Sequence, residues 1–464
     1  MKSLNNVTTT ASFVLFLLGT QGVSIAQSAK LITTFSNPTP ATSEYFGVSV
    51  AAVGPDHVIV GANFDGTGAL HAGSAYLFNT NGTLENTFTN PSPAGLQFFG
   101  RSVLGLGSQE ILIGGAYSRT QATGWFVYRF GSSGTLLTIL TNPVSTGIDS
   151  FGWSMAQLGD DRLLIGSPLD SKGPGGAAYL FNSDGTLLTM FTNPIPQADG
   201  SFAYSVAALG HDKALIGASR YNPMGISQAG IAYLFTLDGH VVTAFTSPNP
   251  HTNDYFGHSL AAVGYDKVLV GAEGSDEIAP SAGIAYLFST NGALLTTFVN
   301  PTHASGAYFG AGVTAVGNDR VLVAAPYQYN SSGVVYIFRT NGTLLATINA
   351  PNPEVDDTFG FALATVGSDF VAIGAYGKDT YTGAAYLFSI PPATPPSLAI
   401  HPSTTNTIVI SWPSPSTGFV LQQKLGLKPG LWNNVTGPIQ DDGATKSFVL
   451  SADSTTSFFR LAWQ

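Results

Sequence analysis

The chain has 464 residues, of which 44% are hydrophobic and 9% are charged, and it contains 54 glycines. This composition suits packed sheets joined by tight turns and argues against a disordered chain. The net charge of −10 arises without a run of Lys or Arg that could follow a phosphate backbone, so nucleic acid is a poor candidate partner. Because cysteine is absent, disulfides, thiolate metal sites and cysteine nucleophiles are excluded.

Residues 1–26 are predicted to form a signal peptide. Lys2 supplies a positive start, Ala11 to Leu18 an apolar segment, and Ser24-Ile25-Ala26 a small-x-small cleavage site. The apolar segment is shorter than the roughly 20 residues that a membrane-spanning helix needs. We therefore expect cleavage after Ala26, a secreted, extracellular or cell-surface location, and no membrane span in the mature chain.

A Phe-Gly pair recurs through residues 27–390 and marks seven copies of one unit. Successive copies are 50 to 54 residues apart, which is long enough for four short strands and their turns. The pairs begin at Phe46, Phe99, Phe151, Phe256, Phe309 and Phe359, with Phe202-Ala203 as an altered copy.

The first two predicted strands of a copy are visible at residues 46–53 and 58–60. The first follows the Phe-Gly pair, and the second is an unbroken apolar run that ends in Gly61-Ala62. Apolar runs of this kind mark strands that are covered on both faces, as in blades stacked against each other.

The third predicted strand carries an Ala-Tyr-Leu-Phe motif, at residues 75–78 in the first copy. A turn such as Asn81-Gly82, typical of type I′ hairpins, leads to a fourth strand. The last copy lacks this fourth strand, whereas Leu31 to Phe35 has its sequence but no preceding partners. We predict an all-β fold: a seven-bladed β-propeller of four-stranded blades whose ring is closed by the N-terminal strand.

Taken together, the Phe-Gly strand, the Gly-Ala element and the Ala-Tyr-Leu-Phe strand resemble the FG-GAP repeat family, which forms the seven-bladed heads of integrin α subunits. The resemblance implies an extracellular binding or adhesion role. Calcium-binding members carry an Asp-rich loop between the first two strands, and Ca²⁺ needs 6 to 8 oxygen ligands. Here the turn has one regular acid in six copies and Gln109 in the other, so we expect no metal site and no cofactor, and acids that bond turn amides. These acids are Asp56, Asp161, Asp212, Asp266, Asp319 and Asp369.

Residues 391–396 are predicted to be a Pro-rich linker, and residues 397–464 a small all-β, sandwich-like C-terminal module. The Ile-Ser-Trp-Pro and Phe-Phe-Arg-Leu stretches resemble C-terminal modules of secreted proteins from environmental bacteria. Trp412, Trp432 and Trp463 fit core packing better than a carbohydrate platform, because so small a sandwich needs large side chains.

Strand alternation places the loops before each Phe-Gly pair and the loops after each second strand on one face of the ring. We predict a ligand site there, near the channel mouth, with turn capping and inter-blade packing as the alternative explanation. The loops before the Phe-Gly pairs contribute Glu44, Tyr45, Phe98, Asp149, Asp254, Tyr255, Tyr308 and Asp357. The loops after the second strands contribute Arg220, Tyr221, Tyr327, Tyr329 and Tyr381.

No His-Glu-x-x-His spacing, nucleophile elbow or phosphate-binding glycine loop is present, so no catalytic residue is predicted. The favoured interpretation is a secreted or cell-surface binding or adhesion protein that uses the propeller as a rigid platform for an extracellular protein or glycan. Two alternatives stay open: a secreted polysaccharide-active enzyme with its site at the channel mouth, and a purely structural surface or matrix protein.

Overall fold

The computed structural model describes residues 29–93, 95–115, 124–144, 149–170, 175–197, 200–391, 397–402, 407–414, 419–425, 432–451 and 457–463. The predicted signal peptide with its cleavage site, and residues 392–396 of the predicted linker, lie outside this range. Contacts divide the chain into one compact unit of Ser28–Ala393 and a second that contains Thr394–Gln464. Among the described residues, no helix is long and apolar enough to cross a membrane.

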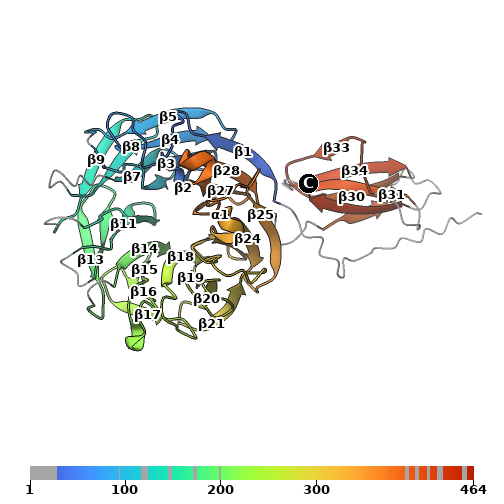
Figure 1. The fold of residues 1–464 in the computed structure, drawn as a ribbon. Helices are drawn as coiled ribbons and strands as arrows, with labels where there is room; N and C mark the ends of the chain where they lie inside the picture. Colours follow the sequence, from blue (N-terminus) through green and yellow to red (C-terminus); the bar gives the residue numbers. More distant parts are fainter. Residues whose placement is uncertain are drawn as a thin grey trace, which may run out of the picture. The chain divides into compact units, whose positions relative to one another are not determined.

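The first unit is a β-propeller, and its described residues form seven four-stranded antiparallel sheets. Figure 1 shows the sheets arranged around a common axis, with their last strands at the rim. The first sheet comprises β2 (Phe46–Val53), β3 (His57–Ala62), β4 (Ser74–Asn79) and β5 (Leu84–Thr89). The second comprises β6 (Ser102–Leu106), β7 (Glu110–Gly115), β8 (Phe126–Gly131) and β9 (Leu136–Thr141), and the third β10 (Ser154–Leu158), β11 (Arg162–Ser167), β12 (Ala177–Asn182) and β13 (Leu187–Thr192).

The remaining sheets repeat this arrangement. The fourth comprises β14 (Phe202–Leu209), β15 (Lys213–Ala218), β16 (Ile231–Thr236) and β17 (Val241–Phe245), and the fifth β18 (Phe256–Val263), β19 (Lys267–Ala272), β20 (Ile284–Ser289) and β21 (Leu294–Val299). The sixth comprises β22 (Gly312–Val316), β23 (Arg320–Ala325), β24 (Val334–Arg339) and β25 (Leu344–Asn349), and the seventh β26 (Ala362–Val366), β27 (Phe370–Ala375), β28 (Ala384–Ser389) and β1 (Leu31–Ser36).

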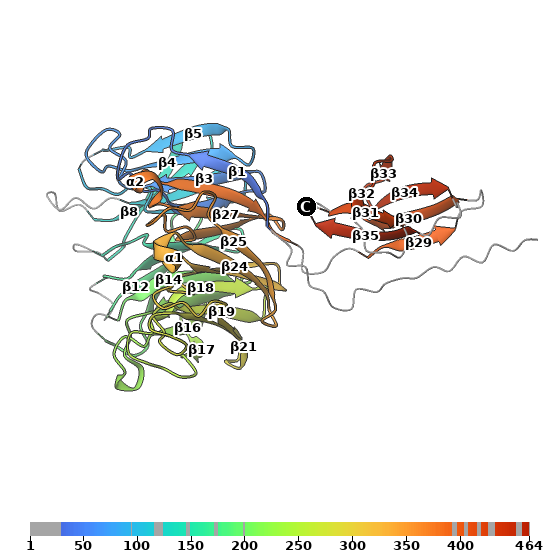
Figure 2. The same cartoon turned by 45° about the vertical axis from the view of Figure 1, so that its right-hand side comes forward.

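The first strands of the sheets form a closed inner ring. Each contacts the first strand of the next sheet, and β26 returns to contact β2. Among the described residues of the loops between second and third strands are three short turns: η1 (Pro223–Gly225), α1 (Gln328–Ser331) and α2 (Lys378–Tyr381). In Figure 2, α1 and α2 lie toward the same face of the propeller, as their equivalent places in the repeat require.

Aromatic packing explains why the Phe-Gly and Ala-Tyr-Leu-Phe motifs recur together. In the first sheet the Phe46 ring lies 5.8 Å from that of Tyr76 and 6.0 Å from that of Phe78, the latter edge-on at 88°. Phe46 is fully buried, and the equivalent Phe-Tyr contact occurs in each of the other six sheets. The two motifs therefore supply opposite halves of one core cluster in every blade.

The ring closes as the missing fourth strand of the last copy predicts. Residues of β1 pair antiparallel with β28, with Phe35 opposite Ala385. The fully buried Phe35 ring then packs 5.2 Å from Phe78 of the first sheet. The N-terminal strand thus belongs to the last sheet, where it covers the edge of β28, and its Phe35 ring contacts the first sheet.

The Gly of the Gly-Ala element permits close approach of neighbouring sheets. A Cβ on Gly61 would lie 2.0 Å from the carbonyl oxygen of Gly100 in the next sheet. The Ser49 hydroxyl donates to this same carbonyl at 2.8 Å, and equivalent serines bridge four further seams. Backbone contact, which needs a residue without a side chain, therefore sets the seam spacing.

The Phe-Gly pair is a turn as much as a strand start. In each sheet the residue after the pair donates its backbone N–H to the carbonyl three residues earlier, as Val48 does to Tyr45 at 3.1 Å. The glycine has φ of +89° at Gly47, the left-handed value that the third position of a type II turn requires. In four sheets the first strand consequently begins two residues after the glycine, later than the sequence pattern indicates.

The described residues of the second unit form seven short strands. They are β29 (Ala399–Pro402), β30 (Thr407–Pro413), β31 (Phe419–Leu425), β32 (Asn433–Asn434), β33 (Ile439–Asp441), β34 (Thr445–Ser451) and β35 (Ser457–Trp463). They form one sheet in the order β29-β30-β34-β33 and another in the order β32-β31-β35. Ile410, Trp412 and Leu421 are the buried centre of the core, so Trp412 packs internally.

Candidate binding site at the mouth of the channel

The residue that follows each Phe-Gly pair lines one cavity of about 920 Å³ at the propeller axis. The turn described above delivers this residue to the start of the innermost strand, so all seven positions face the same space. They are Val48, Arg101, Trp153, Tyr204, His258, Ala311 and Phe361. A uniform scaffold thus presents seven different side chains on one ring.

Four consecutive members of this ring contact each other. The Arg101 guanidinium carbon lies 4.3 Å from the centroid of the Trp153 ring, a cation–π contact. The Trp153 and Tyr204 rings are 5.5 Å apart, and the Tyr204 hydroxyl lies 3.2 Å from His258 Nε2. One arc of the channel mouth is therefore a continuous aromatic and basic wall.

A carboxyl group completes this arc. Glu273, which directly follows β19, places Oε1 3.2 Å from His258 Nε2, with side chains 15% and 23% exposed. Burial raises the pKa of Glu273 to about 7. Burial also lowers the pKa of His258 to about 4, and the nearby charges of Arg220 and Arg101 act in the same direction. Between about pH 4 and pH 7 the pair is accordingly a neutral carboxyl beside a neutral imidazole.

Tyrosines from two loops form a further part of the wall. Tyr308, just before the Phe-Gly turn of the sixth sheet, and Tyr327, just before α1, have rings 5.3 Å apart in an edge-on arrangement. Phe361 packs edge-on against Tyr376 at 4.6 Å. Burial raises the pKa values of Tyr327 and Tyr376, so both phenols stay neutral and available for hydrogen bonds.

Of the thirteen predicted site residues, the structure brings Tyr308 and Tyr327 to this cavity. The four acids are at most 7% exposed and accept hydrogen bonds from loop backbone amides instead. These bonds join Glu44 to Ala41, Asp149 to Phe151, Asp254 to His251 and Asp357 to Glu354. For the acids, turn capping is therefore the role that the geometry displays.

The remaining predicted residues lie around the cavity rather than in its wall. Tyr45 packs against Phe64, Tyr376 and Tyr381, and Phe98 packs against Phe64. Tyr221 is buried in the core, Tyr255 is half-buried, and Arg220 and Tyr329 are exposed. These predicted residues therefore lie on the same face as the cavity without lining it.

Sequence reasoning missed Arg101, Trp153, Tyr204, His258 and Glu273. A signal for four of them was present, because the residue after Phe-Gly changes in every copy while its neighbours repeat. Variation within a repeated frame is a mark of a functional position, because packing alone would favour similar residues there.

The regular acids of the turns between first and second strands lie at the other ends of these strands. Four of them pair with the basic residue that follows, as Asp212 does with Lys213 at 2.6 Å and Asp266 with Lys267 at 2.9 Å. Across the described ranges, no group of three or more His, Asp or Glu side chains is arranged to hold a metal ion.

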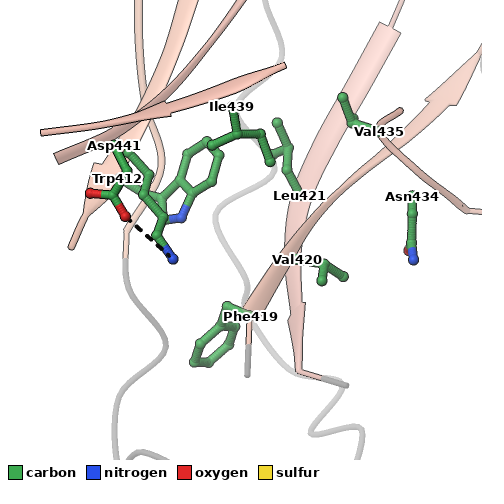
Figure 3. A pocket seen from close by; sticks show the side chains of 9 residues that line it. Trp412, Phe419, Val420, Leu421, Asn434, Val435, Ile439 and Asp441 are labelled. Atoms are coloured by element: carbon green, nitrogen blue, oxygen red, sulfur yellow. Dashed lines mark ion pairs between the residues drawn. The ribbon is translucent and has the colours of Figure 1, made fainter. Parts of the chain in front are cut away.

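A second cavity, of about 400 Å³, lies within the C-terminal module (Figure 3). Its wall is mostly apolar, with Phe419, Val420, Leu421, Val435 and Ile439 around the buried Trp412. Its charged groups, Asp441 and Lys446, pair with each other at 3.9 Å. This composition fits a gap in the core of a small sandwich better than a polar binding site.

The FG-GAP repeat model matches residues 37–78, 242–288 and 343–388, which cover the first, fifth and seventh sheets from before the Phe-Gly pair to the end of the third strand. The curated proteins contain no match to the chain.

Proposed function

Because this chain carries FG-GAP repeats that fold into a β-propeller, we propose that it is a binding protein whose ligand enters the channel mouth. The observation that carries the proposal is the ring of residues after the Phe-Gly pairs. The scaffold there is nearly invariant, whereas the side chains differ in all seven copies and line one cavity. A rigid framework with variable side chains on one face is the usual arrangement of a recognition surface.

The predicted signal peptide supports an extracellular or cell-surface location, and in that setting the ligand is a glycan or an extracellular protein. The opposite face of the propeller, with its short Gly-x-Asp and Asn-Gly turns, offers fewer distinctive groups. We therefore assign recognition and adhesion to the face with the cavity.

The proposal predicts a face-specific loss of binding. The purified protein is screened on a glycan array and a panel of extracellular matrix proteins, and the affinity for each hit is measured by calorimetry. The double variant Tyr308→Ala and Tyr327→Ala should weaken binding at least tenfold, because both rings line the cavity. Tyr265→Ala is the matched control, since this tyrosine is 78% exposed in the turn between β18 and β19.

Loss of binding in Tyr265→Ala, with the double variant unaffected, would place the site on the other face and overturn the proposal. Thermal melting of each variant shows whether any loss arises from unfolding.

A second candidate function is enzymatic action on a polysaccharide. One observation favours it, the contact between Glu273 and His258. A carboxyl group with a pKa near 7 is suited to general acid or base catalysis near neutral pH. Incubation with a panel of polysaccharides, followed by assays for new reducing ends and unsaturated products, tests this. If the wild type forms such products and Glu273→Gln does not, the function is catalysis rather than binding.

A further inference from the structure

Arg101 is a cation in the cavity wall without an acidic partner. Its guanidinium makes no hydrogen bond or ion pair with another described residue, and its contact is the Trp153 ring. Arg129, by contrast, pairs with Glu110 at 2.5 Å. Burial lowers the pKa of Arg101, yet guanidinium stays charged under all ordinary conditions. An enclosed charge without a partner costs free energy that an anionic ligand would offset.

The contact with Trp153 also limits the positions that this cation can adopt. An arginine that lies over an aromatic ring keeps its N–H groups directed outward in the guanidinium plane. In that plane the fork of N–H donors matches the two oxygens of a carboxylate. Arg101, held at 4.3 Å from the Trp153 ring, therefore brings a fork of donors that suits a carboxylate to the cavity wall.

The rest of the cavity wall does not oppose an anion. The other titratable groups in it are Tyr204, His258, Glu273, Tyr308 and Tyr327. Between about pH 4 and pH 7 burial keeps both His258 and Glu273 neutral, and the nearby Arg220 adds a positive charge. The cavity is thus locally positive in a protein whose net charge is −10.

Aromatic faces and hydrogen-bonding groups both line the same cavity. Tyr308, Tyr327 and Phe361 offer apolar ring surface, while the phenols, His258 Nε2 and the Glu273 carboxyl offer donors and acceptors. A sugar ring presents both kinds of surface, with C–H groups on its faces and hydroxyls at its rim. The cavity volume of about 920 Å³ is at the upper end of the range for small-ligand sites, so it accommodates a short oligosaccharide.

Building on the proposed binding function, we propose that the channel mouth binds an acidic polysaccharide and that Arg101 pairs with the carboxylate of one uronic acid unit. Tyr308, Tyr327 and Phe361 contact the ring faces of the adjacent units. The ligand class is therefore a carboxylated sugar rather than a neutral glycan or a peptide.

The test compares ligands that differ only in charge. Calorimetry at pH 6 measures binding of trimers of galacturonate, glucuronate, mannuronate and guluronate, and of the methyl ester of each trimer. We expect at least one acid trimer to bind at least tenfold more tightly than its ester. Arg101→Gln should remove this difference by weakening the acid trimer alone, whereas Arg162→Gln, which alters an arginine paired with Asp161 away from the cavity, should leave it unchanged.

Arg101→Lys keeps the folded protein's charge but loses the fork, so it should retain only part of the discrimination. Melting temperatures close to that of the wild type for either variant keep the comparison valid.

Each further outcome is decisive. A neutral oligosaccharide that needs Tyr308 and Tyr327 but not Arg101 overturns the carboxylate assignment and leaves the binding function standing.

A poly-glutamate peptide that binds through Arg101 as tightly as the trimers overturns the sugar class. A protein that binds neither sugars nor matrix proteins through Tyr308 and Tyr327 overturns both the ligand class and the binding function.

Discussion

At the scale of single residues, Glu273 couples the channel mouth to pH. Its pKa is about 7 in the folded protein against an ordinary value of 4.5, because burial disfavours its charged form. Because Glu273 holds its proton more tightly in the folded than in the unfolded protein, its protonation stabilises the fold. This contribution is fully present below about pH 4.5 and is lost as the pH rises through 7. In alkaline solution the folded state therefore contains a buried, ionised carboxylate, which lowers the free energy of unfolding.

Glu273→Gln should relieve this cost, since the amide stays neutral at every pH. We expect the variant to exceed the wild type in unfolding free energy by roughly 2–3 kcal/mol at pH 8, at about 1.4 kcal/mol per pKa unit, and to lose most of this advantage at pH 4.5. Urea unfolding at the two pH values measures it. Glu85→Gln is the control, because Glu85 also contacts a histidine, at 2.9 Å, but is 40% exposed. An equal gain at both pH values would contradict the assignment.

At the scale of the element, the Phe-Gly turn starts every inner strand and thereby aims the residue that lines the channel. Gly47 has φ of +89°, and a Cβ there would lie 2.2 Å from the carbonyl oxygen of Ala384. The altered copy has Ala203 at the equivalent position with φ of 67°, so this sheet tolerates strain that the others avoid.

Gly47→Ala should destabilise the protein by roughly 2–4 kcal/mol, through backbone strain and collision with Ala384. Ala203→Gly should have the opposite sign and stabilise by up to about 1 kcal/mol, because it removes strain. Gly367→Ala isolates the strain, because its φ is +59° and no atom lies within 4 Å of the added Cβ. Thermal unfolding compares the three variants, and equal losses for Gly47→Ala and Gly367→Ala would argue against the collision.

At the scale of the whole molecule, one strand from the start of the chain joins the two ends of the ring. Deletion of Leu31–Ser36 should lower the melting temperature and promote aggregation, because β28 becomes an unpaired edge. Phe35→Ala should by itself cost about 3–5 kcal/mol, since its fully buried ring bridges the last and first sheets.

Ile32→Ala is the control for this closure, because Ile32 lies on the same strand but is 45% exposed. Its effect should stay within about 0.5 kcal/mol. Unchanged melting and solubility after deletion of the strand would show that the ring is held together without it.

The sequence alone determined the architecture of the propeller, because each local pattern recurs in successive copies and so identifies the same strand in every sheet. The Phe-Gly pair, the Ala-Tyr-Leu-Phe strand and the missing fourth strand of the last copy predicted the all-β class, the four-stranded blades and the pairing of Leu31 to Phe35 with the end of the ring. Each pattern reflects packing that recurs in every copy, so the same signal appears seven times.

Only the tertiary structure decided which side chains share the cavity. Asp149 and Arg101 are both polar residues close to a Phe-Gly pair, yet Asp149 turns back to bond the amide of Phe151 while Arg101 faces the axis. A turn of the backbone at the glycine separates these outcomes, and Glu273 joins His258 from the position just after the second strand of the same sheet. Sequence patterns report which residues repeat, whereas the meeting of residues from all seven sheets at one axis depends on closure of the ring.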